Sequence, residues 1–187
     1  KKYNLKIIED AAEVIGQTYQ GMQCGSFGDV STFSFYPNKH ITTGEGGMVF
    51  CDDKLLDERA KSFRNLCFGA DRFIHDELGE NYRMTNMQAA LGVAQLENID
   101  ATVNKKRYIG YTYNELLKDL GTINLPVART DFCENIYWVY AITLKDDFKK
   151  TAKEVMTELS SYSIGTRPFF YPMHKQPVFN RMGLFLE

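Results

Sequence analysis

Residues 31–47 read STFSFYPNKHITTGEGG, and this stretch decides the fold. Bulky and small residues alternate over residues 30–35, which predicts a buried strand. Lys39 follows in a short polar turn, and residues 42–47 add two hydroxyls and three glycines. An amine at the mouth of a sheet, beside hydroxyls and flexible glycines, favours a lysine that condenses with a carbonyl group. The alternative is an ordinary surface lysine.

A second buried strand is predicted at residues 6–10, where apolar residues end in two acids. The carboxyl ends of strands in an open α/β sheet are where such sheets bind ligands. Asp10 is therefore a candidate ligand-binding carboxylate, and a helix N-cap is the alternative. Residues 11–16 can form a helical turn closed by Gly16, which would put Glu13 on the same face as Asp10.

The composition is that of an ordinary globular protein. The 187 residues are 44% hydrophobic and 25% charged, with a net charge of −2, so nothing indicates binding to nucleic acid or to an anionic membrane. The chain has no apolar run near the ~20 residues of a membrane helix, and no signal peptide opens it. The four cysteines form no C-x-x-C pair and the three histidines have no metal-ligand spacing. We therefore expect free thiols, a cytoplasmic location and no metal.

The next segment is predicted to alternate helix with loop. Asp52 or Asp53 can cap a helix that runs to about Asn65. Residues 67–80 carry few regular signals and are expected to form a loop.

A long helical pattern then begins at Thr85, where Gln88 three residues later predicts a capping box. The pattern continues for many turns, with a break near Asp100. Such a length suggests a helix that joins two lobes. The predicted domains are residues 1–104 and 105–187, the second being a smaller α+β unit.

Three elements are expected in the second domain. Alternating aromatic and small residues predict a strand over residues 137–144. Residues 148–160 have the pattern of an amphipathic helix. Prolines within residues 166–174 favour an edge strand or a loop there.

Four stretches carry a family resemblance. They are IIEDAAEVIG (7–16), SFGDVSTFSFYPNKHITTGEGGMV (26–49), NYRMTNMQAALG (81–92) and TRPFFYPMH (166–174). In this order they resemble the DegT/DnrJ/EryC1/StrS sugar-nucleotide aminotransferases, which depend on pyridoxal 5′-phosphate (PLP) and have fold type I. The resemblance implies an α/β fold, with a large domain built on a mostly parallel sheet and a small α+β domain.

The resemblance also assigns roles in the large domain. It makes Lys39 the residue that holds PLP and Asp10 the partner of the protonated ring nitrogen, which keeps the ring able to accept electrons. Glu13 would lie beside the ring, with a solvated glutamate as the alternative. Ser34 would contact the cofactor phosphate, where a short hydroxyl donor fits a tight site.

Other residues are implied to bind across an interface or near the substrate. Asn81 would contact the PLP phosphate of the neighbouring subunit in a homodimer with shared active sites. Arg83 would either support this loop or meet the carboxylate of the amino donor, and Glu80 stands where the family usually has an aromatic residue. Arg167 and His174 are candidate sugar-nucleotide contacts, and aromatic packing with a rim histidine is the alternative.

The implied activity is transfer of an amino group from glutamate to a 4-keto-6-deoxy sugar nucleotide, with GDP as the first choice of nucleotide. Relatives that dehydrate the sugar instead have a histidine in place of the lysine, in a motif resembling PAHHIT, whereas residues 37–42 read PNKHIT. Family chains are about twice as long, so this one resembles their middle and later part. The alternative function is therefore an inactive fragment, or half of a split enzyme that needs its partner.

Overall fold

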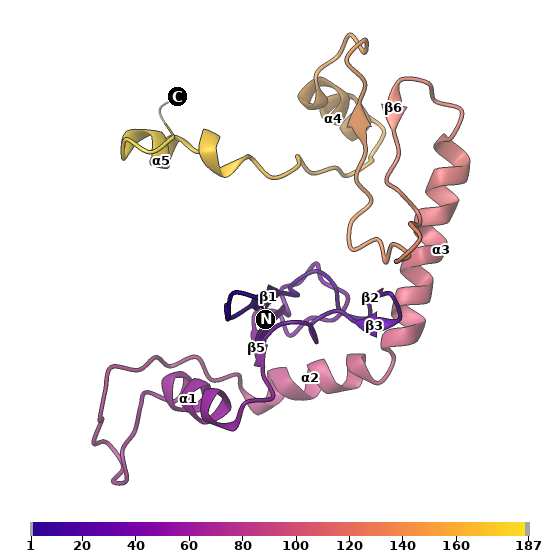
Figure 1. The fold of residues 1–187 in the computed structure, drawn as a ribbon. Coiled ribbons are helices and arrows are strands. Elements are labelled where there is room, and N and C mark those ends of the chain that lie inside the picture. The colour runs from indigo at the N-terminus through magenta and orange to yellow at the C-terminus, as the bar shows by residue number, and fades with distance from the viewer. Residues whose placement is uncertain (1, 186–187) are drawn as a thin grey trace. The chain divides into compact units, whose positions relative to one another are not determined.

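The computed structural model describes residues 2–185, and the chain divides into two compact units (Figure 1). The first unit comprises Lys1–Glu115 and Val127–Tyr140, and the second comprises Leu116–Pro126 and Ala141–Glu187. The domains predicted as 1–104 and 105–187 remain a prediction. None of the described helices is both long enough and apolar enough to cross a membrane.

A three-stranded sheet in the first unit has the order β1-β4-β5. β1 (Ile8–Asp10) pairs in parallel with β4 (Val30–Ser34), and β4 pairs antiparallel with β5 (Gly47–Phe50). The strand predicted at residues 30–35 is thus confirmed. The sheet is not mostly parallel over the described residues, because a plain loop returns the chain from β4 to β5 and a parallel return needs a crossover.

The outer strands of this sheet are more exposed than predicted. Residues 6–10 were expected to form a buried strand, yet Ile8 is 75% exposed. The buried cluster lies instead around Ile15, Phe35 and Ile41. The core of the first unit therefore sits under β4 and the loop that follows it.

A short hairpin precedes β4. β2 (Thr18–Tyr19) and β3 (Met22–Gln23) pair antiparallel. Gln20 and Gly21 both have positive φ, 50° and 81°, which a two-residue type I′ turn requires. The Gln20 N–H donates to the Phe132 carbonyl at 2.7 Å, so the hairpin is tied to a loop far along the chain.

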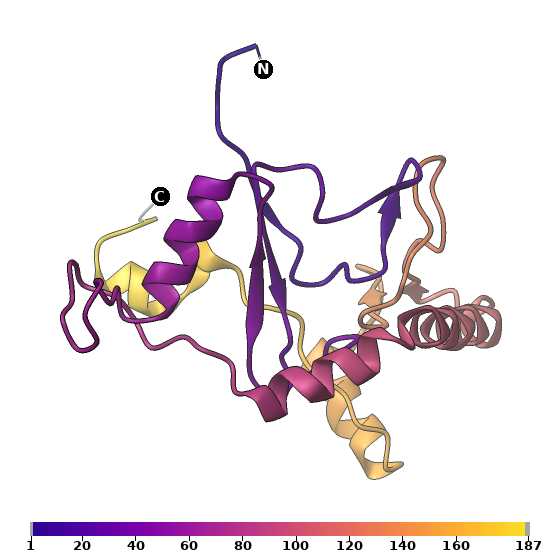
Figure 2. The same cartoon turned by 90° about the horizontal axis from the view of Figure 1, so that it is seen from below.

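Three helices follow, and the first two begin at predicted caps. α1 (Lys54–Arg64) begins after Asp53, whose carboxylate accepts from two backbone N–H groups. α2 (Asn86–Leu96) begins at the predicted Thr85–Gln88 capping box, and α3 (Ile99–Leu117) follows after a break slightly before Asp100. Figure 2 shows α2 crossing one end of β4 and β5, where the Gln95 amide donates to the Thr42 carbonyl at 2.7 Å.

The strand predicted at residues 137–144 is wrong except for its last two residues. Tyr137 has φ 47°, and its N–H donates to Asn135 Oδ1 at 2.7 Å instead of to a neighbouring strand. Of residues 137–144, only Thr143–Leu144 (β7) pair with another strand, β6 (Ile123–Asn124). A strand forms where a neighbour completes its hydrogen bonds, and alternation alone does not supply that neighbour.

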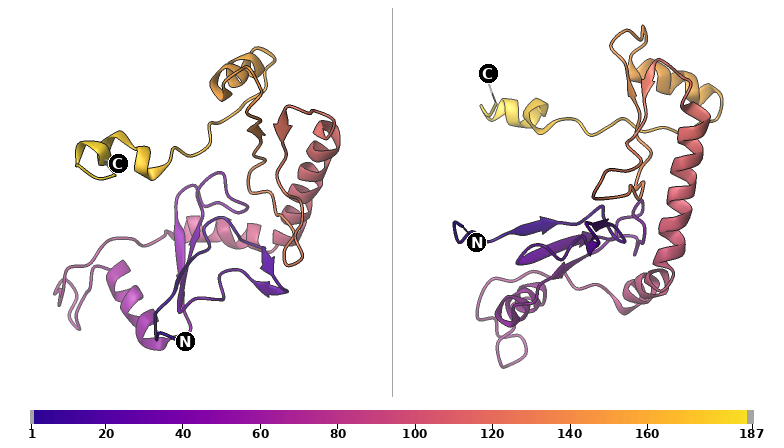
Figure 3. Two further views of the ribbon diagram at one scale, coloured as in Figure 1. Left: turned by 45° about the horizontal axis from the view of Figure 1, so that its top comes forward. Right: turned by 45° about the vertical axis from the view of Figure 1, so that its right-hand side comes forward.

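The rest of the second unit is helical or extended (Figure 3). α4 (Ala152–Ser161) begins four residues later than the predicted start, because Thr151 and Glu154 form a capping box there. Residues 166–172 are a loop, one of the two predicted forms. A 3-10 turn, η1 (Met173–Lys175), and α5 (Pro177–Arg181) complete the described chain.

Tyr137 packs on a glycine of α3. Its side chain is buried, with 3% exposed, and a Cβ added at Gly110 would lie 2.4 Å from the ring. The phenol oxygen accepts from Asn114 Nδ2 at 3.2 Å. Gly110 therefore allows the ring to lie directly on the helix backbone.

Replacing Gly110 should test this contact. We expect Gly110→Ala to lower the free energy of unfolding by about 1–3 kcal/mol, because the new methyl group overlaps the Tyr137 ring. Chemical denaturation followed by circular dichroism measures the change. Gly121→Ala is the matched control, since nothing lies within 4 Å of a Cβ there. Equal stability of the two variants would contradict the packing argument.

Candidate active site

Two of the predicted site residues end parallel neighbouring strands. Asp10 is the last residue of β1 and Ser34 is the last residue of β4. The register pairs Asp10 with Thr32, so Asp10, Thr32 and Ser34 lie on the same face of the sheet. Because parallel strands end at the same edge, the loops that follow β1 and β4 leave the sheet side by side.

These two loops bring a lysine and a glutamate together. Lys39 Nζ lies 3.2 Å from Glu13 Oε1, and the Lys39 side chain is only 9% exposed whereas that of Glu13 is 46% exposed. A tight turn places the lysine, since its N–H donates to the Tyr36 carbonyl at 3.0 Å. The amine is therefore held at the sheet edge and does not extend into solvent as a surface lysine does.

An aromatic ring completes the surroundings of this amine. Lys39 Nζ lies 3.8 Å from the centre of the Trp138 ring, close enough for a cation–π interaction. Trp138 lies within the strand that the sequence predicted over residues 137–144, and no functional role was predicted for it. No local pattern indicates the contact, because about a hundred residues separate the two side chains.

The segment after β1 forms turns and no helix. Val14 N–H donates to the Ala11 carbonyl at 3.3 Å, and Gln17 N–H donates to the Val14 carbonyl at 2.9 Å. The predicted helical turn over residues 11–16 is therefore wrong, and Asp10 does not cap a helix there. Asp10 Oδ1 instead accepts from the Ala12 N–H at 3.1 Å, which fixes the carboxylate at the end of its strand.

Ser34 also has a local contact that orients it. Its Oγ accepts from the Tyr36 N–H at 3.3 Å. A hydroxyl that accepts one hydrogen bond still has its own hydrogen to donate. Ser34 can therefore serve as a donor to an anionic group at this edge.

Asn81 and Arg83 lie on the loop between α1 and α2. Arg83 Nε donates to Asn81 Oδ1 at 3.2 Å, and Arg83 Nη1 donates to Asn65 Oδ1 at 2.9 Å. Arg83 thus braces its own loop against the end of α1. Whether either residue contacts a cofactor or an amino donor stays a prediction.

Arg167 and His174 belong to the second unit. Both side chains are exposed, and His174 lies in η1. Their predicted contact with a sugar nucleotide stays a prediction.

His40 is a buried residue for which the sequence predicted no role in the site. It is 7% exposed, and its Nε2 lies 3.1 Å from the Ile136 carbonyl oxygen. Burial is the main cause that lowers the His40 pKa, and the positive charges of Lys106 and Lys39 lower it further, while the hydrogen bond to Ile136 opposes them. The ring is therefore neutral at pH 7 and donates its Nε2 hydrogen to the carbonyl.

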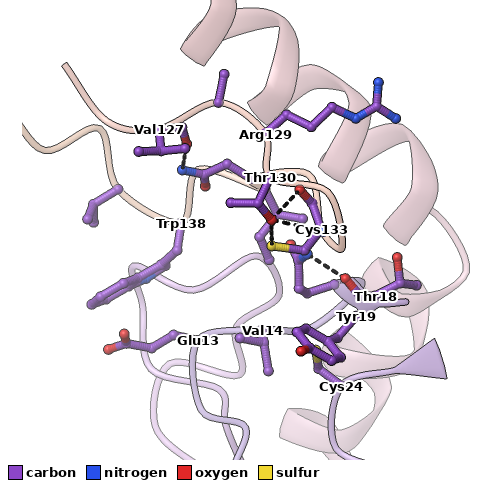
Figure 4. A pocket seen from close by; sticks show the side chains of 15 residues that line it. Glu13, Val14, Thr18, Tyr19, Cys24, Val127, Arg129, Thr130, Cys133 and Trp138 are labelled. Carbon is purple, nitrogen blue, oxygen red and sulfur yellow. Dashed lines mark hydrogen bonds between the residues drawn. The ribbon is translucent and has the colours of Figure 1, made fainter. Parts of the chain in front are cut away.

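Glu13 and Trp138 also line a hollow of about 470 Å³ in the first unit. Figure 4 shows them next to each other at one side of it, with Tyr19 and Cys24 at the other side. The hollow is open and mixes polar with apolar side chains, and it begins directly beside the pair that holds Lys39.

The side-chain types at this edge match what PLP requires. If PLP binds here, Lys39 would supply an amine for the aldehyde, Asp10 a carboxylate for the ring nitrogen, and Ser34 a hydroxyl for the phosphate. One carboxylate oxygen of Asp10 accepts a hydrogen bond from the Ala12 N–H. The hydrogen bond from the Lys39 amine to Glu13 can break when the amine bonds to another group. The chemistry of these donors therefore fits the cofactor that the resemblance implies.

A sheltered lysine paired with a glutamate, at the edge where two parallel strands of an α/β sheet end, agrees with the aminotransferase class that the resemblance implies. The sequence profile described as the DegT/DnrJ/EryC1/StrS aminotransferase family matches residues 1–184. The chain belongs to this family.

Individual relatives agree with this assignment. The chain is 41% identical over 181 residues to GDP-perosamine synthase of Escherichia coli O157:H7, covering 96% of this chain and 48% of the relative. It is 35% identical over 179 residues to the putative pyridoxal phosphate-dependent aminotransferase EpsN of Bacillus subtilis strain 168, covering 95% and 45%. The chain spans about half the length of the curated relatives it matches.

A solved structure shows the same fold. Helicobacter pylori PseC, an aminotransferase involved in the biosynthesis of pseudoaminic acid, superposes with a TM-score of 0.89 at 27% identity. The match covers 97% of this chain and 49% of PseC.

The buried His40 predicts a pH dependence of stability. Because its folded pKa lies below the ordinary value of 6.5, the unfolded chain binds more protons than the folded chain below about pH 6.5. The contribution of His40 to the free energy of unfolding is thus complete above that pH. It is lost as the pH falls towards the folded pKa, and the free energy of unfolding then changes by at most about 1.4 kcal/mol per pH unit.

Urea denaturation of the wild type and of His40→Gln between pH 7.5 and pH 5 measures this slope. We expect the pH dependence to be shallower in His40→Gln, whose amide can still donate to Ile136. His174→Gln is the control, because that ring is exposed. A slope that is identical in all three proteins would rule out His40 as its source.

Proposed function

We propose that the protein, as the full product of its gene, uses PLP to transfer an amino group from glutamate to a 4-keto-6-deoxy sugar nucleotide. The observation that carries this proposal is the Lys39 amine, 9% exposed and 3.2 Å from Glu13, at the sheet edge that Asp10 and Ser34 share. A lysine in such a place is suited to bond to an aldehyde and to release it again.

Each residue of the edge then has a task. PLP, when bound, supplies the electron sink that makes the α-carbon of the amino donor acidic. Lys39 Nζ, as the free amine, would take up the proton of that carbon and later give it back. Asp10 would accept a hydrogen bond from the protonated ring nitrogen, Ser34 would donate to the phosphate, and Glu13 would pair with the ammonium that forms once the amine has taken up the proton.

Lysine at position 39 favours amino transfer over sugar dehydration. In the dehydratases that the motif resembles, histidine stands in the place of this lysine. The Lys39 amine can both hold the cofactor and move the proton, and two half-reactions at one site give ping-pong kinetics.

The substrate class is inferred from relatives that the chain matches along almost its whole length. GDP-perosamine synthase of Escherichia coli O157:H7 matches at 41% identity, and TTGEGG and TRPFFYPMH resemble that branch. We infer a GDP-linked sugar of the perosamine type, used in the synthesis of a surface polysaccharide or glycan. UDP-linked and dTDP-linked keto sugars are the alternatives that an assay distinguishes.

The site is proposed to be completed by a second copy of the protein. Asn81 would reach the cofactor phosphate of the neighbouring subunit, and Arg167 and His174 would contact the sugar nucleotide. The chain spans only about half of its relatives, so the second candidate function is an inactive piece, or half of a split enzyme that needs its partner.

Cofactor binding is the first test. On addition of PLP, the protein should develop a visible absorption band at about 410–430 nm, and Lys39→Ala should abolish it, because the amine is the group that bonds to the aldehyde. Lys61→Ala is the matched control, since Lys61 lies exposed on α1 and pairs with Asp57. A band that survives in Lys39→Ala would refute the role of Lys39, and no band in any protein would favour the inactive piece.

Activity is the second test. Incubation with glutamate and with GDP-, UDP- and dTDP-linked 4-keto-6-deoxy sugars should yield an amino sugar and 2-oxoglutarate, fastest for the GDP-linked substrate. Lys39→Ala should lower kcat by at least about 10²-fold, because proton transfer by a positioned group contributes that much. Preference for another nucleotide would correct the substrate, and amino transfer by Lys39→His would refute the assigned mechanism.

A further inference from the structure

The surroundings of the Lys39 amine contain more than the proposed mechanism uses. One side of the amine faces Glu13 at 3.2 Å, and another faces the Trp138 ring at 3.8 Å from its centre. An ammonium that leaves water needs compensation, and the negative face of an indole supplies it. The ring therefore replaces part of the hydration that stabilises the charge of an exposed lysine.

Trp138 is itself held from two directions. Its indole N–H donates to the carbonyl of Asn38 at 3.1 Å, the residue immediately before Lys39. Its own carbonyl accepts from Lys106 Nζ at 3.1 Å. The ring is thus tied to the turn that carries the lysine, and the backbone of Trp138 is tied to α3.

The residue before Trp138 has an unusual backbone conformation. Tyr137 has φ 47°, in the left-handed region that non-glycine residues rarely occupy. It stays there because its ring is buried on Gly110 and its N–H donates to Asn135 Oδ1. Such conformations persist only where the surroundings fix them, and they gather at functional sites. Here the conformation brings the next side chain onto the lysine.

We propose that Trp138 is a positioning residue for Lys39. Its ring face holds, beside Glu13, the ammonium that forms when the Lys39 amine takes up a proton, and its N–H fixes the turn at Asn38, so that the flexible lysine side chain keeps one direction when it is not bonded to the cofactor. A lysine side chain has many rotamers, and restricting them in advance lowers the cost of each return to the reactive position. This inference rests on the proposed function, because it assigns Trp138 a task in the cycle of Lys39.

Chemical labelling of the amine tests the proposal without any cofactor. The full gene product, free of PLP, is treated briefly with acetic anhydride, and the acetylation rates of Lys39 and Lys106 are read by peptide mass spectrometry. Trp138→Leu should raise the Lys39 rate by about tenfold, because the ring face that shelters the ammonium is lost. Trp138→Phe keeps a ring face and should raise the rate less.

Lys106 is the internal control. It donates to the backbone carbonyl of Trp138, a contact that the side-chain substitutions keep, so its rate should stay at the wild-type value. A Lys39 rate unchanged by Trp138→Leu, or Lys39 and Lys106 rates that rise together, would overturn the proposal and leave Trp138 as a packing residue.

A second measurement of the Lys39 acetylation rate keeps the shape of the side chain at position 138. Tryptophan carrying one to four ring fluorines can be incorporated in place of Trp138, which weakens the negative face of the ring stepwise. The Lys39 acetylation rate should rise with each fluorine, and a rate that is independent of fluorination would overturn the proposal. The labelling does not involve PLP, so its outcome is separate from the absorption test of the proposed function.

Discussion

The parallel pairing of β1 with β4 is the constraint on which the rest of the site depends. Three residue pairs fix the register, and this sends the chain out of both strands at the same edge. Asp10 and Ser34 end on one face, and the loops that follow bring Glu13 to Lys39. A slip of one residue would turn every side chain of β1 to the other face and take Asp10 away from Ser34.

A second constraint comes from far along the chain. The segment before Val139 folds back on α3, where Tyr137 lies on Gly110 and Trp138 reaches the lysine. Tyr137 keeps its left-handed backbone conformation because its ring is buried and its N–H group donates to Asn135 Oδ1. The site is therefore built from the sheet edge and from a strained turn that covers it, and the mixed hollow beside Glu13 begins where these two parts meet.

Local sequence signals were sufficient for the elements whose hydrogen bonds are made by residues close in the sequence. The caps at Asp53 and Thr85 depend on residues a few positions apart, and both formed as the sequence predicts. The strand predicted over residues 137–144 failed because its alternation had no partner strand to complete its hydrogen bonds. The turn at residues 11–16 failed as a helix because a single turn is too short to stabilise itself.

The sequence by itself determined the family, the strand that leads to Lys39 and the acid that ends β1, because these lie within continuous motifs of residue type and spacing. Only the tertiary structure decided that Lys39 is sheltered between Glu13 and Trp138 and that His40 is buried against Ile136. The physical reason is sequence distance: about a hundred residues separate Lys39 from Trp138, and no local pattern specifies a contact that depends on how α3 and the sheet edge pack around the lysine.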